Sequence, residues 1–172
     1  MKKAIFFFIC LLAMTSCHKK GVNLFVGDYS FKTSGEVSIT AQAIIDESNV
    51  IIPAVLNASL GDDIGQLNIS VSDKDADEVI VVINYMNGDV ITTTGTCDGN
   101  IIELDDFQRN TLPLSLNVLL SGINTYITVS ARGQMYDDNM IVFDVTLDGR
   151  TTIGSVTCKI KDKNVKMVAY RN

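Results

Sequence analysis

Histidine and tryptophan are nearly missing from this chain, which has one histidine and no tryptophan in 172 residues. The one histidine, His18, lies close to the N-terminus. Ser–His–Asp and Cys–His catalysis, and zinc sites with histidine ligands, all require a histidine inside the folded domain. The 20 acidic residues give no reason to select one catalytic pair. The sequence therefore predicts a protein that is not an enzyme and that uses neither a metal nor another cofactor.

Proline and basic residues are scarce as well. Two prolines and no linker rich in proline, glycine or serine indicate a single domain, and an apolar content of 47% excludes a disordered chain. Lys and Arg number 14 against 20 Asp and Glu, and their one cluster, at positions 159–166, is interpreted as a solvated turn. Nucleic acid is excluded as a partner because phosphate binding needs clustered bases. Residues 73–78 begin like a calcium loop but lack its glycine and glutamate, so we interpret them as a turn.

An apolar run long enough to cross a membrane, about 20 residues, is also missing. The run Ala4–Ala13 has ten residues; Lys2 and Lys3 precede it, and Thr15 and Ser16 follow it before Cys17. This pattern is typical of a secretory signal.

The segment resembles a bacterial lipoprotein signal, in which a small residue precedes an acylated cysteine. Met14 stands where that family usually has Leu, and an apolar methionine fills the same pocket. The resemblance implies cleavage before Cys17, triacylation of Cys17 with palmitate-type chains, and, since His18 replaces the retention Asp, an outer-membrane location on a periplasmic or surface face. We therefore expect a signal peptide at 1–16, a lipidated tether at 17–22 and one β-barrel domain at 23–172.

Apolar residues recur with period two through the domain, which is typical of strands with one buried face. Examples are Val37 to Ile45, Leu67 to Val71 and Ile141 to Leu147, while Val79 to Ile83 is apolar on both faces and indicates a strand covered twice or a barrel wall. Turn signals separate the runs, and Asn87-Gly88 is the clearest hairpin. The pattern predicts an all-β, up-and-down antiparallel meander of about ten strands that closes into a barrel or folds as a two-sheet sandwich. Two segments, 49–58 and 113–120, remain open, the latter between a helix and an extended crossing segment.

Gly27-Asp28-Tyr29 at the start of the first strand resembles the glycine and aromatic residue that open lipocalin-like (calycin) barrels, although that family has Trp where Tyr29 stands. The resemblance covers the whole mature domain and implies a barrel that holds a small hydrophobic or amphipathic ligand. The candidate pocket-lining residues are Tyr29, Phe31, Ile39, Leu67, Val81 and Phe143.

Cys97 and Cys158 are the cysteines of the mature domain besides the lipidated Cys17. The compartment is oxidising and both residues have inward strand parity, so they are a candidate disulfide; the alternative is two buried thiols.

Two functions remain open at this stage. In the first, a membrane-anchored lipoprotein binds a small ligand in its barrel. In the second, a non-catalytic module docks another envelope protein through apolar residues on polar faces, with Ile44, Val82 and Tyr126 as candidates. An apolar cavity of roughly 300 Å³ or more would favour the first.

Overall fold

The computed structural model describes residues 21–45, 50–115, 125–153 and 156–172. Within these residues ten strands form one antiparallel sheet, and helical residues 21–25 precede it. The strands are β1 (Gly27–Ile45), β2 (Val50–Leu60), β3 (Asp63–Val71), β4 (Glu78–Tyr85), β5 (Val90–Asp98), β6 (Ile101–Arg109), β7 (Leu114–Ser115), β8 (Thr125–Tyr136), β9 (Met140–Ile153) and β10 (Val156–Arg171), with one 3-10 turn, η1 (Asp137–Asn139), between β8 and β9.

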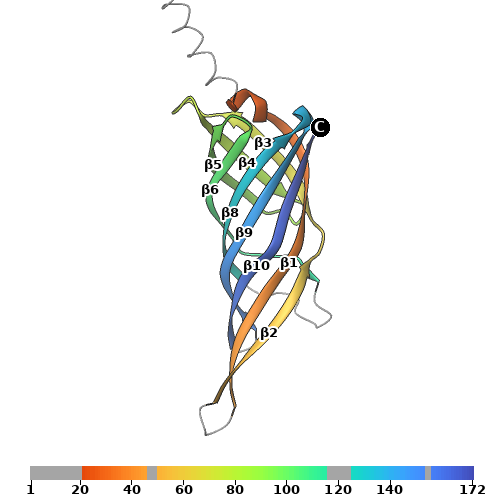
Figure 1. Ribbon diagram of the computed structural model, residues 1–172, viewed down its shortest axis with the longest axis vertical. Coiled ribbons are helices and arrows are strands. Elements are labelled where there is room, and N and C mark those ends of the chain that lie inside the picture. The colour runs from red at the N-terminus through yellow and green to blue at the C-terminus, as the bar shows by residue number, and fades with distance from the viewer. Residues whose placement is uncertain (1–20, 46–49, 116–124, 154–155) are drawn as a thin grey trace, which may run out of the picture.

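Eight of these strands close into a barrel (Figure 1). Their order is β1-β3-β4-β5-β6-β8-β9-β10, and β10 then pairs with β1 from Tyr29 opposite Arg171 to Ala41 opposite Cys158. The predicted all-β meander is confirmed, and the lipocalin-like barrel is the correct one of the two predicted architectures.

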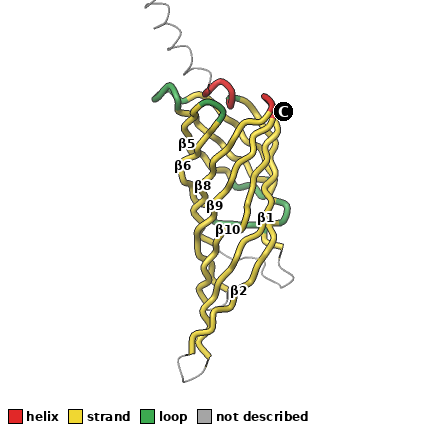
Figure 2. The backbone as a smooth tube through the Cα atoms, viewed as in Figure 1, coloured by secondary structure: helices red, strands yellow, loops and turns green. Residues whose placement is uncertain are grey.

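β1 is long enough to have different neighbours along its two halves. Residues 27–33 pair with β3, a bulge follows at Ser34 and Glu36, and residues 36–45 pair with β2. Gly35 within the bulge has a φ of 134°, a conformation that favours glycine. The strands beyond the bulge extend past the eight-stranded ring to the narrow end of the molecule (Figure 2).

The two segments left open by the sequence are extended where the structure describes them. Positions 50–58 belong to β2, and Leu114–Ser115 forms β7, which pairs with Leu60 and Ser59 of β2. Residues 116–120 lie outside the described part of the chain. The Asn87-Gly88 hairpin is confirmed, with Gly88 at a φ of 94° between β4 and β5.

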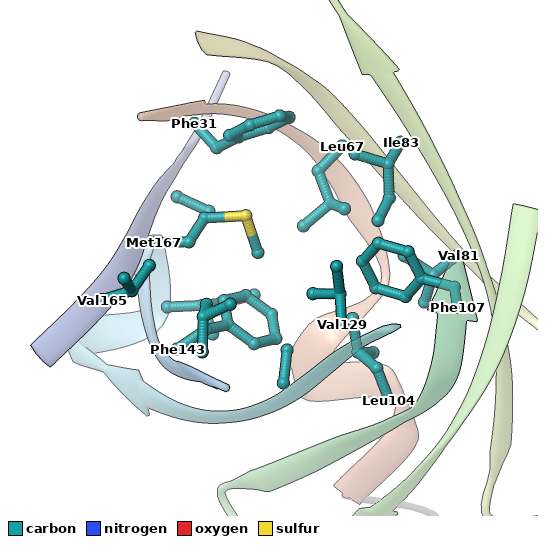
Figure 3. Close-up of a cluster of buried hydrophobic side chains, with 14 of the residues drawn as sticks. Phe31, Leu67, Val81, Ile83, Leu104, Phe107, Val129, Phe143, Val165 and Met167 are labelled. Carbon is teal, nitrogen blue, oxygen red and sulfur yellow. The ribbon is translucent and has the colours of Figure 1, made fainter. Parts of the chain in front are cut away.

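Alternate residues of the ring strands point inward and form one core (Figure 3). Val79, Val81 and Ile83 of β4 are fully buried, whereas Ile80 and Val82 on the opposite face are half-buried. The doubly apolar run is therefore a barrel wall. The labelled core side chains converge from strands on all sides of the ring: Phe31, Leu67, Val81, Ile83, Leu104, Phe107, Val129, Phe143, Val165 and Met167.

Helical residues 21–25 cover one end of the barrel, which we call the plug end (Figure 1). Val22 and Phe25 are buried in the core. The hydroxyl of Tyr29 donates to the carbonyl of Phe25 at 2.8 Å, and Nη2 of Arg171 donates to the carbonyl of Leu24 at 2.5 Å and to the Tyr29 hydroxyl at 2.6 Å. Residues 21 and 22, assigned above to the tether, are thus already part of the folded domain.

Candidate functional site

The six residues expected to line a ligand pocket are all core residues. Each is at most 4% exposed, and none is among the lining residues of the three cavities described below. An eight-stranded ring has room either for a core of packed side chains or for one small ligand, and in this structure buried side chains occupy the interior. The six side chains therefore pack in the core of the barrel and contribute to none of these three cavities. The residues concerned are Tyr29, Phe31, Ile39, Leu67, Val81 and Phe143.

Cys97 and Cys158 are both buried, and no disulfide joins them. Cys97 lies near the plug end, where Gly21 approaches Gly99 and the carbonyl of Cys97. Cys158 is 13 positions from Arg171 on β10, which is about 40 Å along a strand. The predicted disulfide is wrong, because the Cα atoms of a disulfide lie within about 7 Å of each other. Strand alternation correctly predicts that both cysteines point into the barrel, but it cannot show that they lie at opposite ends.

A buried ion pair lies at the other end of the ring. Nη1 and Nη2 of Arg109, the last residue of β6, donate to the two carboxylate oxygens of Asp63, the first residue of β3, at 2.9 Å each. The side chains are 4% and 3% exposed. Two parallel hydrogen bonds between a guanidinium and a carboxylate are the strongest arrangement of this kind, and here they compensate two charges inside an apolar barrel.

Tyr85 and Phe31 complete the cluster around the pair. The Arg109 guanidinium lies 3.8 Å from the centroid of the Tyr85 ring, and Phe31 meets that ring edge-on at 5.3 Å. Burial is the largest single influence and acts to lower the pKa of Arg109, but the hydrogen bonds to Asp63 and the charges of Tyr85, Asp63 and Asp89 together raise that pKa above its ordinary value. Arg109 therefore keeps its positive charge. Its Nε has no hydrogen-bond partner among the described residues.

A short segment, Thr111–Ser115, runs from β6 to β2 across this end, and we call it the strap and this end the strapped end. The Thr111 hydroxyl donates to Asp89 at 2.6 Å, and the amide of Gly61 donates to the carbonyl of Pro113 at 2.6 Å. Hydrogen bonds from Thr111 and Asn87 lower the pKa of Asp89. The strap is therefore held by contacts at the rim of the ring.

Two cavities lie on either side of the strap residue Leu112. One of about 20 Å³ lies inside the barrel beside the ion pair, and Leu112 and Phe107 are among its lining residues. The other, about 160 Å³, lies at the rim, where Leu112, Pro113 and Met86 line it. Asp63, Tyr85 and Leu112 border both. Leu112 is thus the strap residue that contacts both spaces.

A third, larger groove is of a different kind. It measures about 440 Å³ and lies at the plug end between residues 22–23 and 71–76. Residues 73–76 along it are exposed, so it is an open groove, and charged side chains (Asp73, Lys74 and Asp75) lie there beside apolar ones. It lacks the apolar enclosure expected of a small-molecule site.

The residues predicted as docking surface do not form one patch. Tyr126 is 72% exposed on β8, Val82 is half-buried on β4, and strands β5 and β6 separate them. The side chain of Ile44 lies outside the described residues. In the described part of the chain, no group of His, Cys, Asp or Glu has the arrangement of a metal site, and no helix combines the length and apolarity needed to span a membrane.

Breaking the buried ion pair on one side should be strongly destabilising. Arg109→Met leaves the Asp63 carboxylate buried without its partner, and we expect the free energy of unfolding in urea to fall by about 3 to 5 kcal/mol. The double variant Asp63→Leu/Arg109→Met removes both charges and should recover most of that loss. A double variant less stable than Arg109→Met would contradict this account.

Burial raises the pKa of Tyr85 to about 12 against the opposing effect of Arg109. In the unfolded chain the Tyr85 hydroxyl ionises near pH 10. The free energy of unfolding should therefore be at its full value below pH 10 and should fall by about 3 kcal/mol as the pH rises to 12. Tyr85→Phe should lose less stability than the parent between these pH values, whereas Tyr126→Phe, at an exposed site, should follow the parent. If the free energy of unfolding falls equally in the parent and in Tyr85→Phe, ionisation of Tyr85 is not the cause of the pH dependence.

Comparison with known proteins found no matching family model and no matching curated protein. Among solved structures, a redesigned β-barrel, b11L5F_LGL, matches 88% of this chain and 95% of its own length at 14% identity and a TM-score of 0.38. A second structure, EF1p2_mFAP2b bound to DFHBI, matches 90% of this chain and 99% of its own length at 10% identity and a TM-score of 0.41.

Proposed function

We propose that this chain is a lipoprotein of the bacterial cell envelope, anchored to the outer membrane by acyl chains on Cys17. The support is the order of basic start, ten-residue apolar run and small polar residues before Cys17. Several acyl chains, each CH₂ adding about 0.8 kcal/mol of membrane affinity, make such an anchor effectively permanent.

We propose further that the barrel binds a small hydrophobic or amphipathic molecule at its strapped end. The observation that carries this proposal is the position of the Asp63–Arg109 pair, which borders the inner cavity beneath Leu112. A buried ion pair contributes little net stability compared with apolar residues of the same size. The presence of this pair inside a mostly apolar barrel is explained if the pair serves binding.

The chemistry of the site indicates an amphipathic ligand. Arg109 Nε is a buried donor without a partner, so it can donate to a carbonyl, hydroxyl or carboxylate oxygen of a ligand. Phe107, Val129 and Leu147 around the inner cavity offer apolar contacts to the rest of the molecule. Displacement of half-buried Leu112 would join the inner cavity to the rim cavity and admit a ligand that the closed state is too small to hold.

The alternative function is a non-catalytic module that docks another envelope protein. The filled middle of the barrel favours it, as does the number of large apolar side chains exposed toward the strapped end. They are Val55 (61%), Leu56 (42%), Met86 (76%), Val90 (63%) and Tyr126 (72%).

Replacement of Cys17 tests the anchor. Cys17→Ala removes the acylated thiol, so the protein should lack acyl mass, keep residues 1–16 in its intact mass and be missing from the outer-membrane fraction. Cys10→Ala, inside the predicted signal, is the matched control and should fractionate like the parent. A Cys17→Ala protein that reaches the outer-membrane fraction like the parent would contradict lipid anchoring.

Ligand binding is tested with the amphipathic dye anilinonaphthalene sulfonate. The detergent-purified parent should bind it saturably, and Leu112→Ala, which joins the two cavities, should bind about tenfold more tightly, a change of about 1.4 kcal/mol. Leu114→Ala is the matched control, because Leu114 is a half-buried strap leucine that borders neither cavity. The Asp63→Leu/Arg109→Met variant should bind about tenfold more weakly than the parent.

Equal affinities of Leu112→Ala and Leu114→Ala would contradict a site beneath the strap. Absence of any bound small molecule in native mass spectra of protein purified from its own host, together with no saturable dye binding, would exclude ligand binding. Crosslinks from Met86 and Val90 positions to one envelope protein would then support the docking alternative.

A further inference from the structure

We propose that the plug end of the barrel rests against the lipid leaflet, and that Tyr136, Met140 and Tyr170 form the surface that contacts zwitterionic phospholipid. This inference rests on the anchoring through Cys17 proposed above. It adds a fixed orientation of the barrel and a lipid-contact surface, which we call the tyrosine row.

The first argument is the length of chain between the anchor and the fold. Cys17 and Gly21 are four positions apart, so their Cα atoms are separated by at most about 14 Å. Gly21 is held in place at the plug end, where a Cβ atom added to it would lie 3.5 Å from the backbone nitrogen of Gly99. A thiol acylated within the leaflet therefore keeps the plug end at the membrane and leaves the strapped end pointing away from it.

The second argument is that exposed aromatic residues gather next to the point where the tether leaves. The amide of Met135 donates to the carbonyl of Asn100 at 2.9 Å, so Tyr136 lies beside the β5–β6 turn that also holds Gly21. Tyr136 pairs with Met140 across β8 and β9, and Met140 pairs with Tyr170 across β9 and β10. The three residues thus form one row across adjacent strands.

The row points outward from the barrel. Tyr136 is 44% and Tyr170 is 58% exposed, and Met140 between them is half-buried. Their neighbours along the strands, Met135 and Ala169, point into the core. Tyrosine carries a large apolar ring with a polar hydroxyl and is enriched where proteins meet the headgroup region of a membrane. A barrel held by the tether and tilted toward β8–β10 would place this row at that depth.

The charged residues at the Tyr136 end of the row are acidic. Asp137 and Asp138 of η1 follow Tyr136 directly and are exposed. An anionic lipid surface would repel these carboxylates, whereas a zwitterionic headgroup offers no net charge against them. The contact therefore fits a neutral phospholipid surface.

The chain has no tryptophan, so a single Tyr→Trp substitution gives a fluorescence signal from one position only. Full-length Tyr136→Trp, Tyr170→Trp and Tyr126→Trp proteins are produced in a host that acylates lipoproteins and reconstituted into phosphatidylcholine vesicles whose acyl chains carry bromine near the headgroup. Tyr126 is the matched control, since it lies on the same strand and the same outer face as Tyr136 and is 72% exposed, but is ten positions, or about 33 Å, away.

We expect bromolipid to quench Tyr136→Trp and Tyr170→Trp at least about twofold more than Tyr126→Trp, with a blue-shifted emission at the two quenched positions. Equal quenching at all three positions, or none at positions 136 and 170 in protein whose intact mass shows acylated Cys17, would overturn the orientation and leave the anchor standing. Protein that carries no acyl mass at Cys17 would overturn both the anchor and the inference.

Discussion

The pairing of the first ring strand with the last determines what the rest of this molecule can be. The β1–β10 ladder closes the sheet, and the narrow interior of the ring that results is occupied by one cluster of buried side chains. Water is excluded from such an interior, so every polar group inside needs a partner there. The polar clusters built around Arg171 and Arg109 lie at the two ends of the ring and not in its middle. The ends are consequently the places where chemistry other than apolar packing occurs.

At each end an arginine lies next to a tyrosine ring, but the two arginines donate hydrogen bonds to different kinds of partner. Arg171, 5.2 Å from the centroid of the Tyr29 ring, donates to a carbonyl of the plug and so fastens it directly to the barrel. Arg109, 3.8 Å from the centroid of the Tyr85 ring, donates hydrogen bonds from its two terminal nitrogens to Asp63. The strap crosses this second end with hydrogen bonds to Asp89 and Gly61 at the rim. A plug that packs Val22 and Phe25 into the core and accepts a hydrogen bond from Arg171 has more contacts to lose than a strap held at the rim, so we expect the strapped end to open at lower cost.

Much of the fold follows from local pattern, and the site does not. Period-two alternation and turn residues predict the strands and the Asn87-Gly88 hairpin, because both depend on neighbours in the sequence. Strand parity also placed all six candidate pocket residues inside, but parity cannot show whether an interior is hollow. The ion pair was missed for a specific reason: a bulge between Leu104 and Phe107 shifts the register of β6. Alternation continued from Leu104 would turn Arg109 outward, whereas the bulge turns it inward with Phe107. The one signal in the sequence was that Phe107 and Arg109 are two positions apart, so that they share a strand face and an inward Phe107 implies an inward Arg109.

The position of the buried pair relative to the anchor restricts what reaches it. With the plug end tethered near the leaflet, as proposed, the strapped end opens toward water, and a ligand must arrive from solution and not from the bilayer. Such a molecule has to be soluble in water and also apolar enough to replace Leu112 against the core. The site matches both requirements, because Arg109 Nε can donate a hydrogen bond to a polar group of the ligand and the apolar wall can contact the rest. The exposed apolar side chains toward the same end, Met86 and Val90 among them, would bring a docking protein against the strap. A partner that prefers the displaced strap would also favour the open cavity, so at this end docking and ligand binding would be thermodynamically coupled.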